Sequence, residues 1–168
     1  AIELYEQALS KADNPSHVYN MKGNHYYRLE SYQLAQDCYQ QAIELNSNLH
    51  EARFNYALTL IQQKLFNEAL IELEQLVSQY NLIQYRIQLA QLYHQLDKID
   101  QAKEQYHKIL SIDASHAMTH HRLASIYLAD NDRYLAKRHY KKVIESDPTH
   151  SETLHNLASI YLNEKKYQ

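Results

Sequence analysis

The chain has 168 residues, of which 45% are hydrophobic, with one glycine, two prolines and one cysteine, and its formal net charge at pH 7 is −3. So few glycines and prolines exclude an all-β fold, which depends on many tight turns, and the charge balance offers no basic surface for nucleic acid. The single cysteine excludes an internal disulfide, and no apolar run approaches the roughly 20 residues that span a bilayer, so we expect no membrane insertion.

Small and apolar residues recur at helical spacing in pairs of segments that polar breaks separate. The pattern predicts the second helix of a truncated repeat in residues 1–15 and the first helix of another in residues 151–168. Between them it predicts four full helix–turn–helix repeats, in residues 16–49, 50–82, 83–116 and 117–150. We therefore interpret residues 1–168 as a single repeat array.

The repeat at residues 16–49 illustrates the pattern. Its first segment places residues at spacings i, i+4 and i+7, on one face of a helix: Tyr19, Gly23 and Tyr26. A polar break at residues 28–31 follows, and Ala35 and Tyr39 then resume the helical spacing. Residues 46–48, Asn-Ser-Asn, end the unit with side chains that favour turns.

Two tracks of small residues run through the chain at a nearly constant interval. The first track consists of Ala1, Ala35, Ala69, Ala102 and Ala136, and the second of Gly23, Ala57, Ala90, Ala124 and Ala158. Two tracks with one period indicate helix pairs that touch closely at the same two points in every repeat. This predicts an all-α solenoid, a class of fold that binds other proteins.

Most of the 16 tyrosines also recur at fixed repeat positions. We expect these to fill the space between helices: Tyr5, Tyr19, Tyr26, Tyr32, Tyr39, Tyr56, Tyr93, Tyr106, Tyr127, Tyr140, Tyr161 and Tyr167. A surface that stacks on carbohydrate or nucleobases is the alternative, and the regular spacing favours packing.

These repeats resemble the tetratricopeptide repeat (TPR), a helix–turn–helix motif of 34 residues. The resemblance in residues 117–150 rests on Leu123, Ala124, Tyr127, Ala136, Tyr140 and Pro148. Departures, such as Arg53, Arg86 and His120 at the opening aromatic position, affect local packing rather than the fold. The resemblance implies a right-handed α-solenoid of antiparallel helix pairs, the TPR superhelix, in which the first helix of each pair lines a concave groove.

Amide and apolar side chains face the groove that the resemblance implies. Our candidate peptide-binding residues are Asn20, Asn24, Phe54, Asn55, Leu58, Gln88, Gln91, His121 and Arg122. An amide both donates and accepts hydrogen bonds, so it can pair with the N–H and the C=O of an extended peptide. The alternative is that the polar side chains only hydrate this face and that Phe54 packs between repeats.

One TPR subtype grips the C-termini of chaperones with a carboxylate clamp of asparagines and cations. Asn24 and Asn55 match the asparagines of that clamp. Its cations would be expected where this chain has Asn20, Gln84 and Gln88. Without cations a terminal carboxylate has no charge-assisted partner, so we do not expect a clamp of this kind.

The eleven histidines raise the question of a metal site. His116 and His120 are four residues apart on one helix face, as in zinc-binding pairs, and His121 is adjacent. Asp113 is the only carboxylate nearby, so we interpret these residues as surface histidines beside a turn and predict no metal site. The sequence shows no nucleophile–base pattern and no glycine-rich phosphate loop. We accordingly predict no catalytic residue, no cofactor and no enzymatic activity.

The predicted function is that of a protein–protein interaction module, or scaffold, which binds a peptide segment or a partner protein in the concave groove. A recruiting arm of a larger enzyme, such as a glycosyltransferase, and a structural subunit of a secretion, pilus or envelope complex are the alternatives. The truncated repeats at both ends predict end-to-end contacts between copies. The lone Cys38 favours the reducing cytoplasm and leaves a periplasmic location open.

Overall fold

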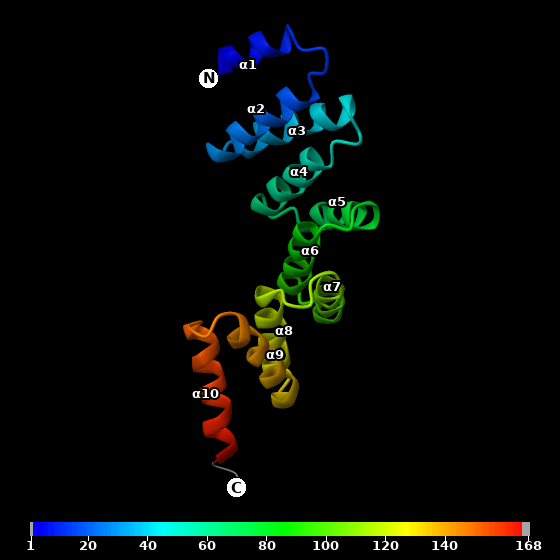
Figure 1. Cartoon of the computed structure of the whole chain (residues 1–168). Coiled ribbons are helices and arrows are strands. Elements are labelled where there is room, and N and C mark those ends of the chain that lie inside the picture. The colour runs from blue at the N-terminus through cyan, green and yellow to red at the C-terminus, as the bar shows by residue number, and fades with distance from the viewer. Residues whose placement is uncertain (1, 166–168) are drawn as a thin grey trace. The chain divides into compact units, whose positions relative to one another are not determined.

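The computed structural model describes residues 2–165, and the regular structure in that range is entirely helical (Figure 1). In chain order the helices are α1 (Ile2–Leu9), α2 (Ser16–Arg28), α3 (Tyr32–Leu45), α4 (His50–Gln62), α5 (Phe66–Gln79), α6 (Ile83–Gln95), α7 (Ile99–Ile112), α8 (Ala117–Ala129), α9 (Arg133–Ser146) and α10 (Ser151–Lys165). The predicted all-α fold is confirmed. Ala1, Tyr167 and Gln168, which the sequence analysis assigned to repeats, lie outside the described residues.

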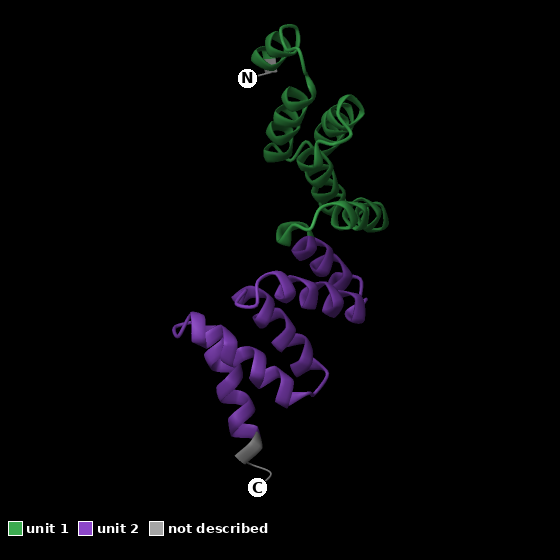
Figure 2. Cartoon of the chain, turned by 45° about the vertical axis from the view of Figure 1, so that its right-hand side comes forward, with its two compact units in different colours: residues 1–85 green, residues 86–168 purple. Residues whose placement is uncertain are grey.

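The helices are grouped in two compact units, residues 1–85 and residues 86–168 (Figure 2). Unit 1 holds α1 to α5 and the first three residues of α6, and unit 2 holds the rest of α6 and α7 to α10. In each unit the helices follow one another through short connections, so neighbours along the chain are also neighbours in space (Figure 1).

The described small residues of the two tracks are buried in both units, with one exception. The fully buried members of the two tracks are Ala35, Ala57 and Ala69 in unit 1 and Ala90, Ala102, Ala124 and Ala136 in unit 2. Gly23 is also buried, in α2. Ala158 of α10 differs because it is exposed, and the described residues contain no helix after α10 that could pack against it.

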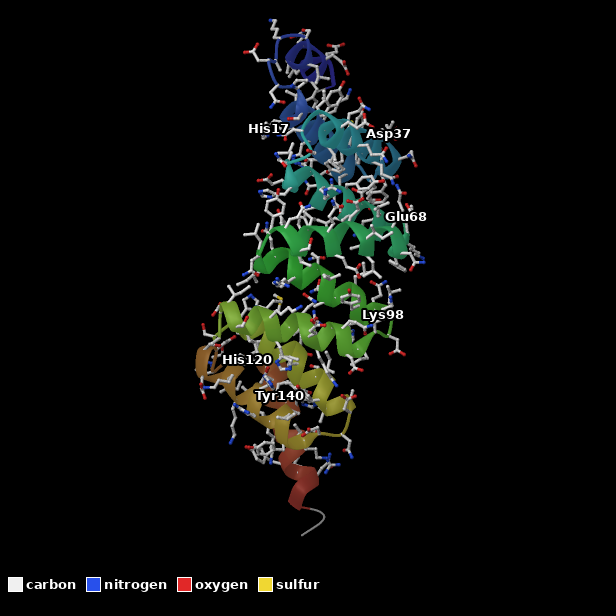
Figure 3. All side chains as sticks on the ribbon, turned by 90° about the vertical axis from the view of Figure 1, so that its right-hand side faces the viewer. His17, Asp37, Glu68, Lys98, His120 and Tyr140 are labelled. Atoms are coloured by element: carbon white, nitrogen blue, oxygen red, sulfur yellow. The ribbon has the colours of Figure 1, made fainter. Side chains whose placement is uncertain are left out.

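Tyrosine rings and leucines complete the interior of both units. Tyr39, Tyr85 and Tyr140 are among the largest side chains that are fully buried. Tyr85 was not among the tyrosines that the sequence assigned to packing. Conversely, Tyr161 was expected to pack, but it is 41% exposed on α10. The exposed sides of the helices and turns carry polar residues such as Asp37, Glu68 and Lys98 (Figure 3).

The turn between the helices of each full pair contains one residue with left-handed backbone conformation. These residues are Glu30 (φ 57°), Lys64 (φ 63°), Asp97 (φ 58°) and Asn131 (φ 61°). Main-chain hydrogen bonds close the turns: the amide of Ser31 donates to Tyr26 O at 3.0 Å, and that of Asp132 to Tyr127 O at 2.8 Å. Such bonds satisfy the last carbonyls of the first helix, which offsets the cost of a left-handed residue that has a Cβ atom.

Candidate functional site

Three asparagines from two helices form a cluster in unit 1. The side-chain amide of Asn55, on α4, donates to Asn20 Oδ1 and to Asn24 Oδ1 on α2, each at 3.0 Å. Tyr39 Oη, on α3, donates to Asn24 Oδ1 at 2.8 Å. The amide nitrogens of Asn20 and Asn24 and the oxygen of Asn55 are not used in these bonds. This asparagine cluster therefore retains donors and an acceptor for a ligand.

Phe54, which directly precedes Asn55 on α4, packs within unit 1. Its ring lies 4.7 Å from that of Tyr85, measured between centroids. Tyr85 Oη is 2.6 Å from His50 Nδ1, and burial raises the pKa of the Tyr85 hydroxyl. Leu58, one turn along α4 from Phe54, is half-buried. Phe54 thus has an aromatic partner inside the unit, which accords with the packing alternative for this residue.

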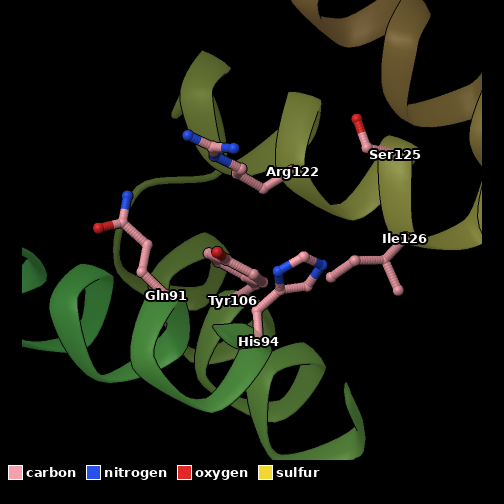
Figure 4. A pocket seen from close by; sticks show the side chains of 6 residues that line it. All are labelled: Gln91, His94, Tyr106, Arg122, Ser125 and Ile126. Carbon is pink, nitrogen blue, oxygen red and sulfur yellow. The ribbon is translucent and has the colours of Figure 1, made fainter. Parts of the chain in front are cut away.

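Unit 2 has a cavity of about 350 Å³ between α6, α7 and α8. It is lined by Gln91, His94, Tyr106, Arg122, Ser125 and Ile126. Figure 4 shows the amide of Gln91 and the guanidinium of Arg122 extending toward the same side of the cavity from α6 and α8. Burial raises the pKa of the Tyr106 hydroxyl, and the positive charge of Arg122 acts in the opposite direction. The cavity is therefore lined by hydrogen-bonding groups and a cation, with no carboxylate.

Arg122 also lines a second cavity of about 390 Å³, with Ala117, Met118, His121, Val143, Asp147, His150 and Glu152. The Arg122 side chain is exposed, and within the part of the chain that the structure describes it forms no ion pair. Other cations of unit 2 do have partners: Lys103 pairs with Asp130 at 2.5 Å and Lys142 with Glu145 at 2.6 Å. Arg122 is thus a cation that lines two cavities, the first without a carboxylate and the second with Asp147 and Glu152, and that forms no direct ion pair with a described residue.

His121 lies beside Arg122 and points into the interior of unit 2. Its Nε2 atom is buried without a hydrogen-bond partner among the described residues, and Glu152 Oε2 is 3.6 Å away. Its ring faces Tyr140 and His150, with centroids 5.7 and 5.1 Å apart. Burial lowers the pKa of the His121 imidazole, and the carboxylate of Glu152 opposes that effect. The neutral ring therefore offers one nitrogen for which the folded chain supplies no partner.

The histidines near the start of α8 have separate roles. His116 precedes α8 and caps it, because its Nδ1 accepts from the amide of Thr119 at 3.3 Å. His120 is 7% exposed and hydrogen-bonded, so the interpretation of it as a surface histidine was wrong. A helix turns about 100° per residue, which directs His120 and His121 to different sides. Among residues 2–165 no group of three or more histidine, cysteine or acidic residues is arranged to hold a metal ion.

Comparison with known protein families identifies the repeats. Tetratricopeptide repeat models match residues 17–49, residues 83–116 and 119–150, and residues 139–168, which together exceed half of the chain. The chain belongs to the TPR family. As a TPR protein it is a scaffold for protein–protein interaction, and repeats of this family are in general non-catalytic.

Solved structures of TPR proteins share this fold at low sequence identity. YrrB, described as a TPR protein with an unusual peptide-binding site, is 22% identical with a TM-score of 0.75, and the match covers 92% of this chain and 80% of YrrB. MamA from Desulfovibrio magneticus RS-1 is 19% identical with a TM-score of 0.77, over 89% of this chain and 85% of MamA. A TPR protein from Parabacteroides merdae is 16% identical with a TM-score of 0.84, over 90% of this chain and 61% of that protein. No curated protein sequence gives a significant match.

The structure brings some of the candidate residues of this TPR protein together and leaves others apart. Asn20, Asn24 and Asn55 are in mutual contact, whereas Gln91 and Arg122 share a cavity. Gln88 is half-buried in α6 and does not line either of the two cavities.

Tyr106 was not predicted as a site residue, because it is on the second helix of its repeat and has the spacing of a packing residue. His94 and Ser125 also line the cavity. They could have been found, since they fall on the same helix faces as Gln91 and Arg122.

No described helix of this TPR protein combines the length and the apolar character that crossing a membrane requires.

Proposed function

We propose that this TPR protein binds a peptide segment of a partner protein, and that the cavity which Arg122 shares with Gln91, and which no carboxylate lines, receives an acidic side chain of that segment. One observation supports this most: Arg122 is exposed, lines two cavities and forms no ion pair with any described residue. A guanidinium binds a carboxylate through paired, charge-assisted hydrogen bonds. A ligand carboxylate would therefore supply the partner that the folded chain does not.

The groups around Arg122 suit an extended peptide. The Gln91 amide can donate to a peptide carbonyl and accept from a peptide amide, and the hydroxyl of Ser125 can do the same. The buried ring of Tyr106 and the side chain of Ile126 give the cavity an apolar part that can contact the stem of an acidic side chain. We include His121 in the proposed surface of unit 2 because it lines the second cavity beside Arg122.

The asparagine cluster of unit 1 offers similar chemistry for main-chain recognition. Its free amide groups can bind a peptide backbone, as can Gln88 of α6. Within unit 1, Phe54 and Leu58 form a second proposed contact surface with the asparagine cluster, because both remain half-buried and can contact apolar side chains of a ligand. The similarity to YrrB, a TPR protein with a peptide-binding site, supports a ligand of this class.

The proposal is tested by selecting ligands from a displayed library of random peptides with the whole chain as bait. We expect the selected peptides to be enriched in aspartate or glutamate. Arg122→Ala should weaken their binding about ten- to a hundredfold, the equivalent of the roughly 1.5–3 kcal/mol of a charge-assisted hydrogen bond. Lys141→Ala, which removes an exposed cation of α9 that lines neither cavity, is the matched control.

Two results would refute the proposal. One is a set of selected peptides without acidic residues whose affinity does not change in Arg122→Ala. The other is an equal loss of affinity in Arg122→Ala and Lys141→Ala, because the effect would then come from net charge rather than from the cavity. Raising the salt concentration should weaken binding to the wild-type chain more than binding to Arg122→Ala.

A further inference from the structure

Three histidines from three consecutive helices meet in unit 2, and none of them lines the two cavities beside Arg122. This histidine cluster consists of His107 on α7, His120 on α8 and His139 on α9; Figure 3 labels His120. The ring centroids of His120 and His139 are 5.1 Å apart, and those of His107 and His139 are 6.5 Å apart. His107, His120 and His139 line one cavity of about 350 Å³ together with Leu110, Ala114, Arg138 and Lys142.

Hydrogen bonds determine which nitrogens of the cluster carry protons. His120 Nε2 is 3.0 Å from the carbonyl oxygen of Ala114, which can only accept, so Nε2 carries a proton. The other nitrogen of neutral His120, Nδ1, is therefore an acceptor. It lies 2.9 Å from His139 Nδ1, which must donate. The space between these two nitrogens holds one proton, and two cationic rings would place two N–H groups against each other.

The third histidine and a tyrosine hold the His139 ring in place. Tyr127, on α8, stacks on His139 with centroids 5.5 Å apart and an interplanar angle of 19°. The hydroxyl of Tyr127 is 3.1 Å from His107 Nε2. The three histidines and Tyr127 therefore connect α7, α8 and α9 through contacts between uncharged rings.

The cations beside the cluster oppose its protonation. From α9, Arg138 and Lys142 line the same cavity, and from α7, Lys103 lies over the Tyr127 ring at 5.4 Å. Carboxylates of the same region have partners of their own: Asp130 pairs with Lys103, Glu145 pairs with Lys142, and Asp113 Oδ1 accepts from the amide and the hydroxyl of Ser115. Burial, His120, His107 and Arg138 together lower the pKa of His139 from 6.5 to about 4. Burial and Lys103 also lower the pKa of His107.

We propose that the histidine cluster is an acid-sensitive lock: it holds α7, α8 and α9 together while its rings are neutral and releases them when the rings are protonated. A proton on His139 would lie close to the guanidinium of Arg138. If both rings were cationic, neither Nδ1 atom could accept, and the Nδ1–Nδ1 hydrogen bond would be lost. Arg122 and Ser125, which line the cavity of the proposed peptide surface, are on α8. Release of α8 from its neighbours would therefore also weaken peptide binding there.

The direction of the effect follows from the folded and unfolded states. The folded-state pKa of His139 is lowered, so its stabilising effect is present above about pH 6.5 and is lost as the pH falls toward 4. The difference between 6.5 and about 4 corresponds to a roughly 300-fold change in the equilibrium between closed and open unit 2. His107 contributes in the same direction.

Hydrogen exchange of the whole chain, corrected for the pH dependence of the chemical exchange rate, measures this change region by region. Between pH 6.5 and 4 we expect amides of α8 and α9 to lose protection by about two orders of magnitude more than amides of α2 and α3, in unit 1. His139→Gln keeps a donor for His120 Nδ1 but does not titrate, so it should remove most of this difference. His155→Gln, which replaces an exposed histidine of α10, should leave it unchanged.

The proposal is wrong if acid weakens the two units equally, or if His155→Gln has the same effect as His139→Gln. Should His139→Gln fail to fold at neutral pH, NMR titration of the imidazoles in the wild-type chain decides. A His139 ring that titrates close to 4 supports the lock, and one that titrates near 6.5 overturns it.

Discussion

Gly23 of α2 packs directly against the ring of Tyr39 on α3, and replacing the glycine tests how firmly that contact is fixed. A Cβ atom at position 23 would lie 2.6 Å from Cε1, 2.7 Å from Cδ1 and 3.0 Å from Cζ of Tyr39. Non-bonded carbon atoms prefer about 3.5–4.0 Å, so the ring would have to move by close to 1 Å. Tyr39 is 1% exposed and its hydroxyl donates to Asn24 Oδ1, so both ends of the ring are held.

Two opposing contributions determine how much Gly23→Ala changes the free energy of unfolding. Overpacking of a tight interior typically costs about 1–3 kcal/mol. Alanine is about 1 kcal/mol more favourable than glycine inside a helix, which offsets part of that cost. Because the Tyr39 ring is buried and hydrogen-bonded, we expect the packing cost to be in the upper part of its range. The net result should be a loss of about 1–2 kcal/mol in the free energy of unfolding, measured by urea denaturation with circular dichroism.

The chain itself supplies the control. One repeat later, Ala57 and Leu73 occupy the positions that correspond to Gly23 and Tyr39, and both are fully buried. Tyr39→Leu alone should be destabilising, because it removes the ring and its hydrogen bond. In that background Gly23→Ala should become stabilising, since the clash is gone and the helix preference remains. A gain in stability from Gly23→Ala in the wild-type chain would refute the reasoning, because it would mean that the Tyr39 ring moves aside at little cost.

Three further changes have measurable outcomes in the same unfolding assay. His116→Ala should destabilise unit 2 by about 1 kcal/mol because α8 loses the cap that accepts from Thr119, whereas His116→Asn should retain most of it. Lys64→Gly should stabilise by roughly 0.5 kcal/mol, since the strain of a left-handed residue exceeds the entropy cost of glycine; Lys64→Ala, which keeps the Cβ atom, should give no gain. Asn55→Ala should cost about 1–2 kcal/mol because it removes two side-chain hydrogen bonds, and an unchanged unfolding midpoint would show that the asparagine cluster does not contribute to folding.

The helical fold could be predicted because the sequence repeats one pattern several times. Each small residue of a track, such as Ala69 or Ala102, is a weak signal alone, but a common period makes the set specific. Both of these residues are fully buried. The burial of Tyr85 could not be predicted from the repeat period. This residue is fully buried against His50 and Phe54, yet it stands at a repeat position that the other tyrosines do not share, so periodicity gave no signal.

The surroundings of the candidate residues could be predicted only in part. That Asn20, Asn24 and Asn55 bond to one another depends on the distance between α2 and α4, which spacing along the chain does not determine. The histidines show the same limit. Proximity in sequence suggested that His116, His120 and His121 form a group, whereas His120 associates with histidines of α7 and α9. These contacts depend on how helices pack, and no local pattern encodes them.

The left-handed turns described above have a practical consequence. Glu30, Lys64, Asp97 and Asn131 are all exposed, and main-chain bonds rather than their side chains close the turns. A cysteine at any of these positions, with Cys38 replaced, would give a point for attaching a fluorophore without disturbing the interior. Energy transfer between two such labels would measure the distance between two turns, and would show whether a ligand or acid changes that distance.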